Sequence, residues 1–304
     1  MLLRPVRDRE DDAQAVRFVA DAALPAPASP CGGPHGDAPL PAPAVRRPHH
    51  ARHLARTDPG GCWLAEDAAG RPVGVVLSTR REGTWGLSLL AVLPEARGRG
   101  VGGALLGRAL EYGRGCLRGI ALVPPHPVAA RVCRRAGLEL HPATRLTGKV
   151  STASLPAPDG AVAGGGPKDR DLMDSVDRRL RGGAHGPDHE ELPRHARLLV
   201  TDDFAGSGYC YLSGGTGGTG GTEGSEVRVE LLGATSRRLA TRLLTAALGA
   251  AGEGRRVRIE GLTAEQQWAL DVGLAAGLEP GTAGWVGLRG MRPPSPYVPC
   301  AAFP

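Results

Sequence analysis

Residues 89–106 read LLAVLPEARGRGVGGALL, and the interpretation of the first half of the chain starts from this run. A mostly apolar strand over residues 85–93 leads into a glycine-rich turn, after which apolar residues recur at helical spacing from Val101 to Tyr112. Backbone N–H groups in the turn and in the first turn of the helix have no partners within the helix. Together they can form a concave, positive site for a phosphate or pyrophosphate.

The residue types in the turn suit an anion. Gly98, Gly100 and Gly102 have no Cβ to hold a phosphate away, and Arg97 and Arg99 add positive charge at the rim. A P-loop is excluded because no Gly-Lys-Ser/Thr ends the run. The bare G-x-G-x-x-G spacing of a dinucleotide fold is present, but the loop follows several strands instead of opening the unit. A turn that serves only helix–strand packing stays open as an alternative.

Strands and helices alternate around this motif and predict an α/β fold for residues 1–150. The expected strands cover residues 2–6, 62–66, 73–79, 85–93, 119–123 and 144–150. The expected helices cover residues 8–23, 48–56, 101–112 and 128–136. Residues 24–44 are crowded with Pro, Ala and Gly and are expected to hold no regular element.

Arg97-x-x-Gly100-x-Gly102 after an apolar strand resembles the acyl-CoA-binding motif of the GNAT superfamily of N-acetyltransferases. The strand and helix that follow, ending in Ala136-Gly137-Leu138, resemble that family's next motif. The resemblance implies an acetyl-CoA-binding domain over residues 1–150, with a mixed, mostly antiparallel sheet flanked by helices. It also implies a bulge in strand 85–93 that opens a slot for the thioester. The implied cofactor-binding residues are Leu90, Ala91, Val92, Arg97, Gly98, Arg99, Gly100, Val101, Gly102 and Gly103.

By the same resemblance, a primary amine of a small molecule or peptide attacks the acetyl carbonyl directly, and a backbone N–H near Val92 stabilises the oxyanion. The family often carries a proton-donating Tyr four residues before the helix-ending glycine. Here that position is Cys133, either a general acid or a buried small apolar residue. Glu82 is either the general base or a solvated turn residue. The alternative function is a non-catalytic acyl-CoA-binding or interaction protein of the same fold.

The second half of the chain partly repeats the first. A linker over residues 151–168 precedes residues 169–292, where strand, helix, strand, helix and strand follow in the order seen in 85–150. The region matching the motif, LLGATSRRLA at 231–240, keeps the single glycine Gly233. We therefore expect a divergent GNAT-like repeat that has lost cofactor binding.

Two further segments of this half lack regular structure in the sequence pattern. Residues 214–224 form a Gly/Thr-rich loop that is expected to be disordered. The tail over residues 293–304 is proline-rich, carries an aromatic residue near its end and is expected to be extended. It lies either across the cleft of the first half or along the surface.

Composition narrows the class of protein. The chain has 304 residues, which suits two domains, and a net charge of +6. Its basic residues are spread along the chain without a dense basic run, which argues against a nucleic-acid partner. No apolar run approaches the roughly 20 residues of a membrane span, so a cytoplasmic protein is expected. Acetyl-CoA and an amine are the partners that the GNAT resemblance implies. Nothing in the sequence specifies the oligomeric state.

The remaining polar clusters predict no metal site. His185, Asp188 and His189 could suggest metal ligands, but their spacing fits no closed site, and Asp188 is expected to cap a helix over 188–195. The six cysteines form no CxxC pair and are expected to be reduced thiols. Three histidines of the basic helix over 48–56 are expected to be exposed to solvent: His49, His50 and His53.

Overall fold

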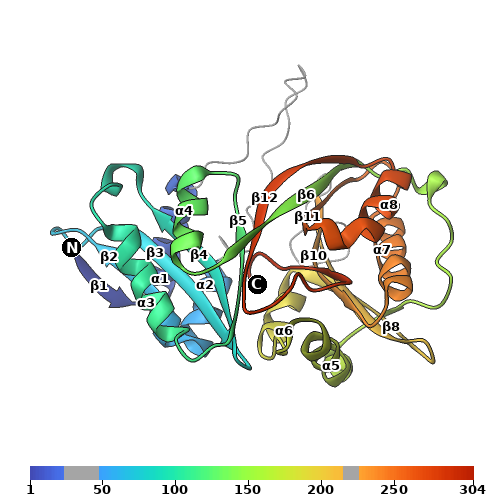
Figure 1. Ribbon diagram of the computed structural model, residues 1–304, viewed down its shortest axis with the longest axis horizontal. Helices are drawn as coiled ribbons and strands as arrows, with labels where there is room; N and C mark the ends of the chain where they lie inside the picture. Colours follow the sequence, from blue (N-terminus) through green and yellow to red (C-terminus); the bar gives the residue numbers. More distant parts are fainter. Residues whose placement is uncertain (24–47, 215–225) are drawn as a thin grey trace, which may run out of the picture.

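The computed structural model describes residues 1–23, 48–214 and 226–304, and these form one continuous sheet with helices packed along it (Figure 1). The expectations for residues 24–44, and for all but the first residue of 214–224, lie outside the described residues. Among the described residues the sheet has 13 strands, in the order β1-β2-β3-β4-β5-β12-β6-β11-β10-β9-β8-β7, with β13 paired to β10. Two neighbouring pairs are parallel, β4–β5 and β10–β11, and the others are antiparallel. The predicted mixed, mostly antiparallel α/β fold is confirmed.

The first half supplies six strands and four helices among the described residues. The strands are β1 (Leu2–Pro5), β2 (Cys62–Glu66), β3 (Pro72–Arg81), β4 (Thr84–Val92), β5 (Arg118–Val123) and β6 (Glu139–Lys149). The helices are α1 (Glu10–Ala23), α2 (Pro48–Thr57), α3 (Val101–Tyr112) and α4 (Pro127–Arg135).

The second half supplies the remaining elements. Its strands are β7 (Ala163–Gly164), β8 (Ala196–Asp203), β9 (Gly206–Ser213), β10 (Val227–Ala234), β11 (Arg256–Leu262), β12 (Glu279–Arg289) and β13 (Tyr297–Val298). Its helices are α5 (Arg170–Arg181), α6 (Asp188–Glu191), α7 (Arg237–Ala251) and α8 (Gln267–Ala275). No helix among the described residues has the length and apolar character needed to cross a membrane.

The two halves exchange their last long strands. β12, from the second half, lies between β5 and β6, while β6, from the first half, lies between β12 and β11 (Figure 1). Each half therefore completes the sheet of the other, and one buried apolar cluster contains residues of both, including Leu89, Tyr211 and Phe303. The boundaries at residues 150, 168 and 292 stay predictions, because the strands of the two halves alternate in the sheet.

Buried ion pairs also join the halves. Arg81, at the end of β3, contacts Asp188 of α6 at 2.6 Å and Asp58 at 2.8 Å, and all three side chains are buried. The expected N-cap role of Asp188 is wrong: the residue begins α6 and makes no capping bond, and α6 ends at Glu191, before a short 3-10 helix over Leu192–Arg194. The carboxylate is instead used across the interface.

Candidate functional site

A slot opens in the sheet where β4 and β5 part. The two strands pair in parallel from Thr84–Arg118 to Leu87–Ala121, and no further pair joins them in the described structure. At this point the β3–β4 register shifts, because Leu87 pairs with Ser78 and Leu89 with Leu77, which leaves Ser88 as an extra residue on β4. The predicted bulge is confirmed. Beyond it, β4 is paired to β3 alone among the strands of the described residues, while β5 stays paired to β12.

The glycine-rich turn lies at the end of β4 and forms the start of α3. Gly98 and Gly100 have φ angles of 76° and 81°, a left-handed conformation that favours glycine. Gly100 is the N-cap, and the amide of Ala104 donates to its carbonyl at 3.0 Å, so the amides of residues 101–103 precede the helical ladder. A Cβ built on Gly98, Gly100 or Gly103 would meet no atom within 4 Å. The turn is thus an open cradle of N–H groups that fits a pyrophosphate.

The two arginines of the motif differ in what they contact. Arg97 donates from Nε to the carbonyl of Val92 at 3.1 Å and from an Nη to the carbonyl of Ala23 at 3.0 Å. It therefore ties the turn to the end of β4 and to the end of α1. The Arg99 side chain is exposed beside the open turn, where its charge is available to an anion.

The bulge also has a second face, which lies against α2 and the tail. Because side chains alternate across a strand, Trp85 lies against Gly113 at the end of α3, whereas a Cβ on Gly86 would lie 2.9 Å from the backbone oxygen of Pro304. Ser88 lies on the same face of the strand, against α2, and its Oγ is 3.0 Å from Nε2 of His50.

The histidines of α2 are less exposed than the sequence analysis expects. His50 and His53 are buried, with 2% and 4% of their surface exposed, so solvent exposure is wrong for both. The reason is the ring of Phe303, whose centroid lies 4.9 Å from that of His50 and 5.5 Å from that of His53. The tail thus lies against the second face of the bulge, a position that the sequence left open.

The two candidate proton-transfer residues have different surroundings. Glu82 sits in the β3–β4 turn with φ 44°, where it pairs with Arg178 of α5 at 2.8 Å and accepts from the amide of Ala184. These two contacts lower the pKa of Glu82, and the contact with Arg178 has the larger effect. Cys133 is buried on α4, and burial raises the pKa of its thiol to about 11.

The second half repeats the bulge but fills its slot. β10 pairs with β11 over Val227–Val229, and a register shift against β9 leaves Glu230 as the extra residue. Beyond the bulge, β13 pairs with β10, with Val298 opposite Leu232 and Tyr297 opposite Gly233. The tail thus occupies, in this half, the position that is open beside residues 90–92 of the first half.

A buried polar cluster holds the tail in place. Oδ2 of Asp177 lies 2.7 Å from Nδ1 of His185 and 3.1 Å from Nε2 of His189, and the other ring nitrogen of His185 lies 3.1 Å from the carbonyl oxygen of Phe303. One donor atom from each of Asp177, His185 and His189 lies within 4.8 Å of the others, so these residues could hold a metal ion. Their contacts with Asp177 have the lengths of hydrogen bonds. Although burial raises the pKa of Asp177, the two histidines hold it well below its usual range.

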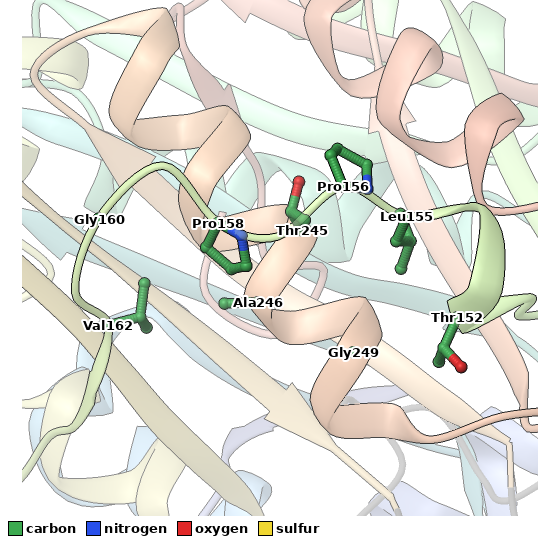
Figure 2. Close-up of a pocket in the computed structure, with 9 residues that line it drawn as sticks. All are labelled: Thr152, Leu155, Pro156, Pro158, Gly160, Val162, Thr245, Ala246 and Gly249. Carbon is green, nitrogen blue, oxygen red and sulfur yellow. The ribbon is translucent and has the colours of Figure 1, made fainter.

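A further pocket of about 470 Å³ lies between the linker and α7, away from the bulge (Figure 2). Figure 2 shows Leu155, Pro156 and Val162 of the linker beside Thr245 and Ala246 of α7. Its lining residues include no titratable side chain, so it offers no acid–base chemistry.

A model of the acetyltransferase (GNAT) family matches residues 29–138, which contain the bulge, the glycine turn and the start of α3. The first half of the chain carries a GNAT-family domain. No curated protein matches the chain. Among solved structures, a putative acetyltransferase from Pyrococcus horikoshii is similar with a TM-score of 0.70 and 16% identity, over 100% of this chain and 95% of that one.

Two other solved structures extend this comparison. A tandem GNAT protein from the clavulanic acid biosynthesis pathway is similar at a TM-score of 0.57 and 18% identity, over 96% of this chain and 99% of that one. A GCN5-related N-acetyltransferase from Kribbella flavida is similar at a TM-score of 0.55 and 21% identity, over 95% of this chain and 72% of that one. At these identities the likeness concerns the fold, and it spans both halves of the present chain as a tandem GNAT arrangement.

Proposed function

We propose that this protein is an acetyl-CoA-dependent N-acetyltransferase whose single cofactor site lies in the first half and whose acceptor is a primary amine of a small molecule or peptide. One observation carries the proposal: the bulge at Ser88, the parting of β4 from β5 and the open glycine turn follow one another along the same strand and loop. This arrangement offers a slot for an extended thioester arm with an anion site at its end.

The glycine turn and the open edge of β4 bind different parts of acetyl-CoA in this proposal. The pyrophosphate of acetyl-CoA is held by the amides of residues 98–103, with Arg99 at the rim and Arg97 fixing the turn. Backbone groups of Leu90, Ala91 and Val92 on the open edge of β4 bind the pantetheine arm, and an N–H near Val92 stabilises charge on the carbonyl oxygen. Acetyl-CoA supplies the activated acetyl group.

The reaction is a direct transfer. The amine nitrogen forms a bond to the acetyl carbon, the bond from that carbon to sulfur breaks, and the amine loses a proton. The raised pKa of Cys133, about 11, makes its thiol a poor proton donor to a leaving thiolate, whose own pKa is about 8.5. We therefore assign protonation of the thiolate to solvent. Glu82, held by Arg178, is assigned to the contact between the halves.

The second half binds no cofactor in this proposal. β13 hydrogen-bonds to β10 where a pantetheine arm would lie, and the region after β10 lacks the glycines of the first motif. Its contribution is structural: β12 completes the sheet beside β5, and the tail closes the acceptor side next to His50.

The test is the release of free thiol from acetyl-CoA in the presence of a panel of amines that includes polyamines, amino acids, aminoglycosides and peptides with free N-termini. The proposal predicts amine-dependent thiol release and an acetylated product by mass spectrometry. If the protein binds acetyl-CoA but releases no thiol with any amine, the alternative of a non-catalytic acyl-CoA-binding protein replaces it. If it does not bind acetyl-CoA, both are wrong.

A further inference from the structure

We propose that His50 is the general base of the acetyl transfer and that it takes the proton of the amine through the hydroxyl of Ser88. The inference rests on the proposed function, and it names a residue that the family comparison does not supply. Ser88 is the extra residue of the β4 bulge and lies at the mouth of the slot. The Nε2 of His50 lies 3.0 Å from the Oγ of Ser88.

The position of His50 is fixed from two sides. Its Nε2 meets Ser88 on β4, and its ring lies edge-on to Phe303 at 65° between ring planes. The ring is 2% exposed, so it is held within a wall and not displayed on the surface of α2. Such a fixed imidazole beside the reacting centre meets the geometric requirement for a general base.

The charged groups on the elements around α2 are engaged with other partners. On α2 itself, Nε2 of His53 lies 3.0 Å from Asp188, which Arg81 of β3 also contacts. On the side of α6, the carboxylate of Glu191 lies 3.1 Å from Arg194 and 3.5 Å from His49. From α5, Arg181 donates to the backbone oxygen of Pro304 at 2.8 Å. The Nε2 of His50 lies 3.0 Å from the Oγ of Ser88 and is thus directed at the bulge.

The proton balance is simple. An amine arrives mostly as ammonium; Ser88 Oγ accepts its proton while the hydroxyl proton passes to His50 Nε2. The neutral amine then forms the bond to the acetyl carbon, and the bond from that carbon to sulfur breaks as the thiolate leaves. The nitrogen releases its second proton to solvent as the amide forms, and the imidazolium releases the first. One of these two protons goes to the thiolate. His50 starts and ends each cycle as neutral imidazole, so no further reactant is needed.

The test compares His50→Gln with His53→Gln in the full chain. Glutamine can still hydrogen-bond to Ser88 but cannot take up a proton, and His53 is the matched control because it lies one turn along α2 and contacts the same ring of Phe303. With the best amine of the panel, we expect kcat of His50→Gln to fall by about a hundredfold or more near neutral pH. The deficit shrinks as the pH approaches the pKa of the amine, because a free amine needs no base.

Binding and pH separate the possible outcomes. Calorimetry with acetyl-CoA is expected to give the same Kd for wild type and His50→Gln, and His53→Gln is expected to keep the wild-type shape of the pH profile even if it is less stable. Ser88→Ala reproduces the profile of His50→Gln. A deficit of His50→Gln that is equal at every pH shows a structural role and overturns the inference. Failure of the wild type to bind acetyl-CoA overturns the proposed function itself.

Discussion

Replacing Gly103 by glutamate separates the contribution of the glycine turn to binding from its contribution to folding. Gly103 is exposed in the first turn of α3, and a Cβ built there meets no atom within 4 Å. Glutamate is a better helix former than glycine by roughly 0.5–1 kcal/mol, and a negative charge at a helix N-terminus contributes about 0.3–1 kcal/mol. The free energy of unfolding is therefore expected to rise by about 1 kcal/mol.

The same side chain opposes cofactor binding. Two unit charges 4 Å apart repel by about 1 kcal/mol in water and about 4 kcal/mol at an effective dielectric constant of 20. Since 1.4 kcal/mol is a factor of ten, the Kd for acetyl-CoA should rise by between about fivefold and about a thousandfold. Stability and affinity are thus expected to change in opposite directions.

Gly107→Glu is the matched control. Gly107 is also exposed on α3, with no atom within 4 Å of a Cβ, and it lies one helical turn, about 5.4 Å, farther from the turn. Its repulsion is expected to be about half or less, and to be screened further by salt. Isothermal titration calorimetry and urea unfolding measure both quantities. Equal Kd values for wild type, Gly103→Glu and Gly107→Glu would refute the placement of the phosphates at this turn.

Arg81→Met leaves two buried carboxylates without their cation and is expected to lower the free energy of unfolding by about 3–5 kcal/mol in urea titrations; a loss below about 1 kcal/mol contradicts the buried pair. Although burial raises the pKa of Asp188, the contacts with His53 and Arg81 lower this pKa on balance. The resulting stabilisation is present above the unfolded pKa of about 3.9 and is lost as the pH falls below that value. Asp188→Asn should therefore flatten the fall of the unfolding free energy at acid pH, and an unchanged fall would contradict the lowered pKa. Cys133→Ala is expected to leave kcat nearly unchanged in the thiol-release assay, whereas a general acid would be worth about a hundredfold or more.

Local sequence patterns predicted the elements around the motif closely. The helix expected over residues 101–112 is α3, and the strand expected over 62–66 is β2, because apolar spacing and bounding glycines and prolines act within a few residues. The exchanged strands were predicted too short. β6 begins at Glu139, five residues before the strand predicted over 144–150, and β12 begins at Glu279, six residues before the strand predicted over 285–289. Their early residues include Pro142 and Pro280-Gly281, which pair only because a strand from the other half lies alongside.

Some features of the candidate site could be predicted from local sequence, and others depend on residues far away in the chain. The glycine turn and the bulge could be predicted, since both belong to one continuous run of residues. The burial of His50 could not, because Phe303, about 250 positions later, covers it. The aromatic residue near the end of an otherwise proline-rich tail was the available signal, but no local rule says which surface such a tail covers. Asp188 was likewise assigned to its own helix because its partner Arg81 lies far away in sequence.

The stoichiometry of acetyl-CoA binding to the wild-type chain tests the central claim most directly. The open slot beside β4 and the slot beside β10 that β13 fills predict one site per chain in a calorimetric titration. Two sites per chain would show that the tail does not close the second half to the cofactor. No binding would contradict the assignment of the first half as an acetyl-CoA site.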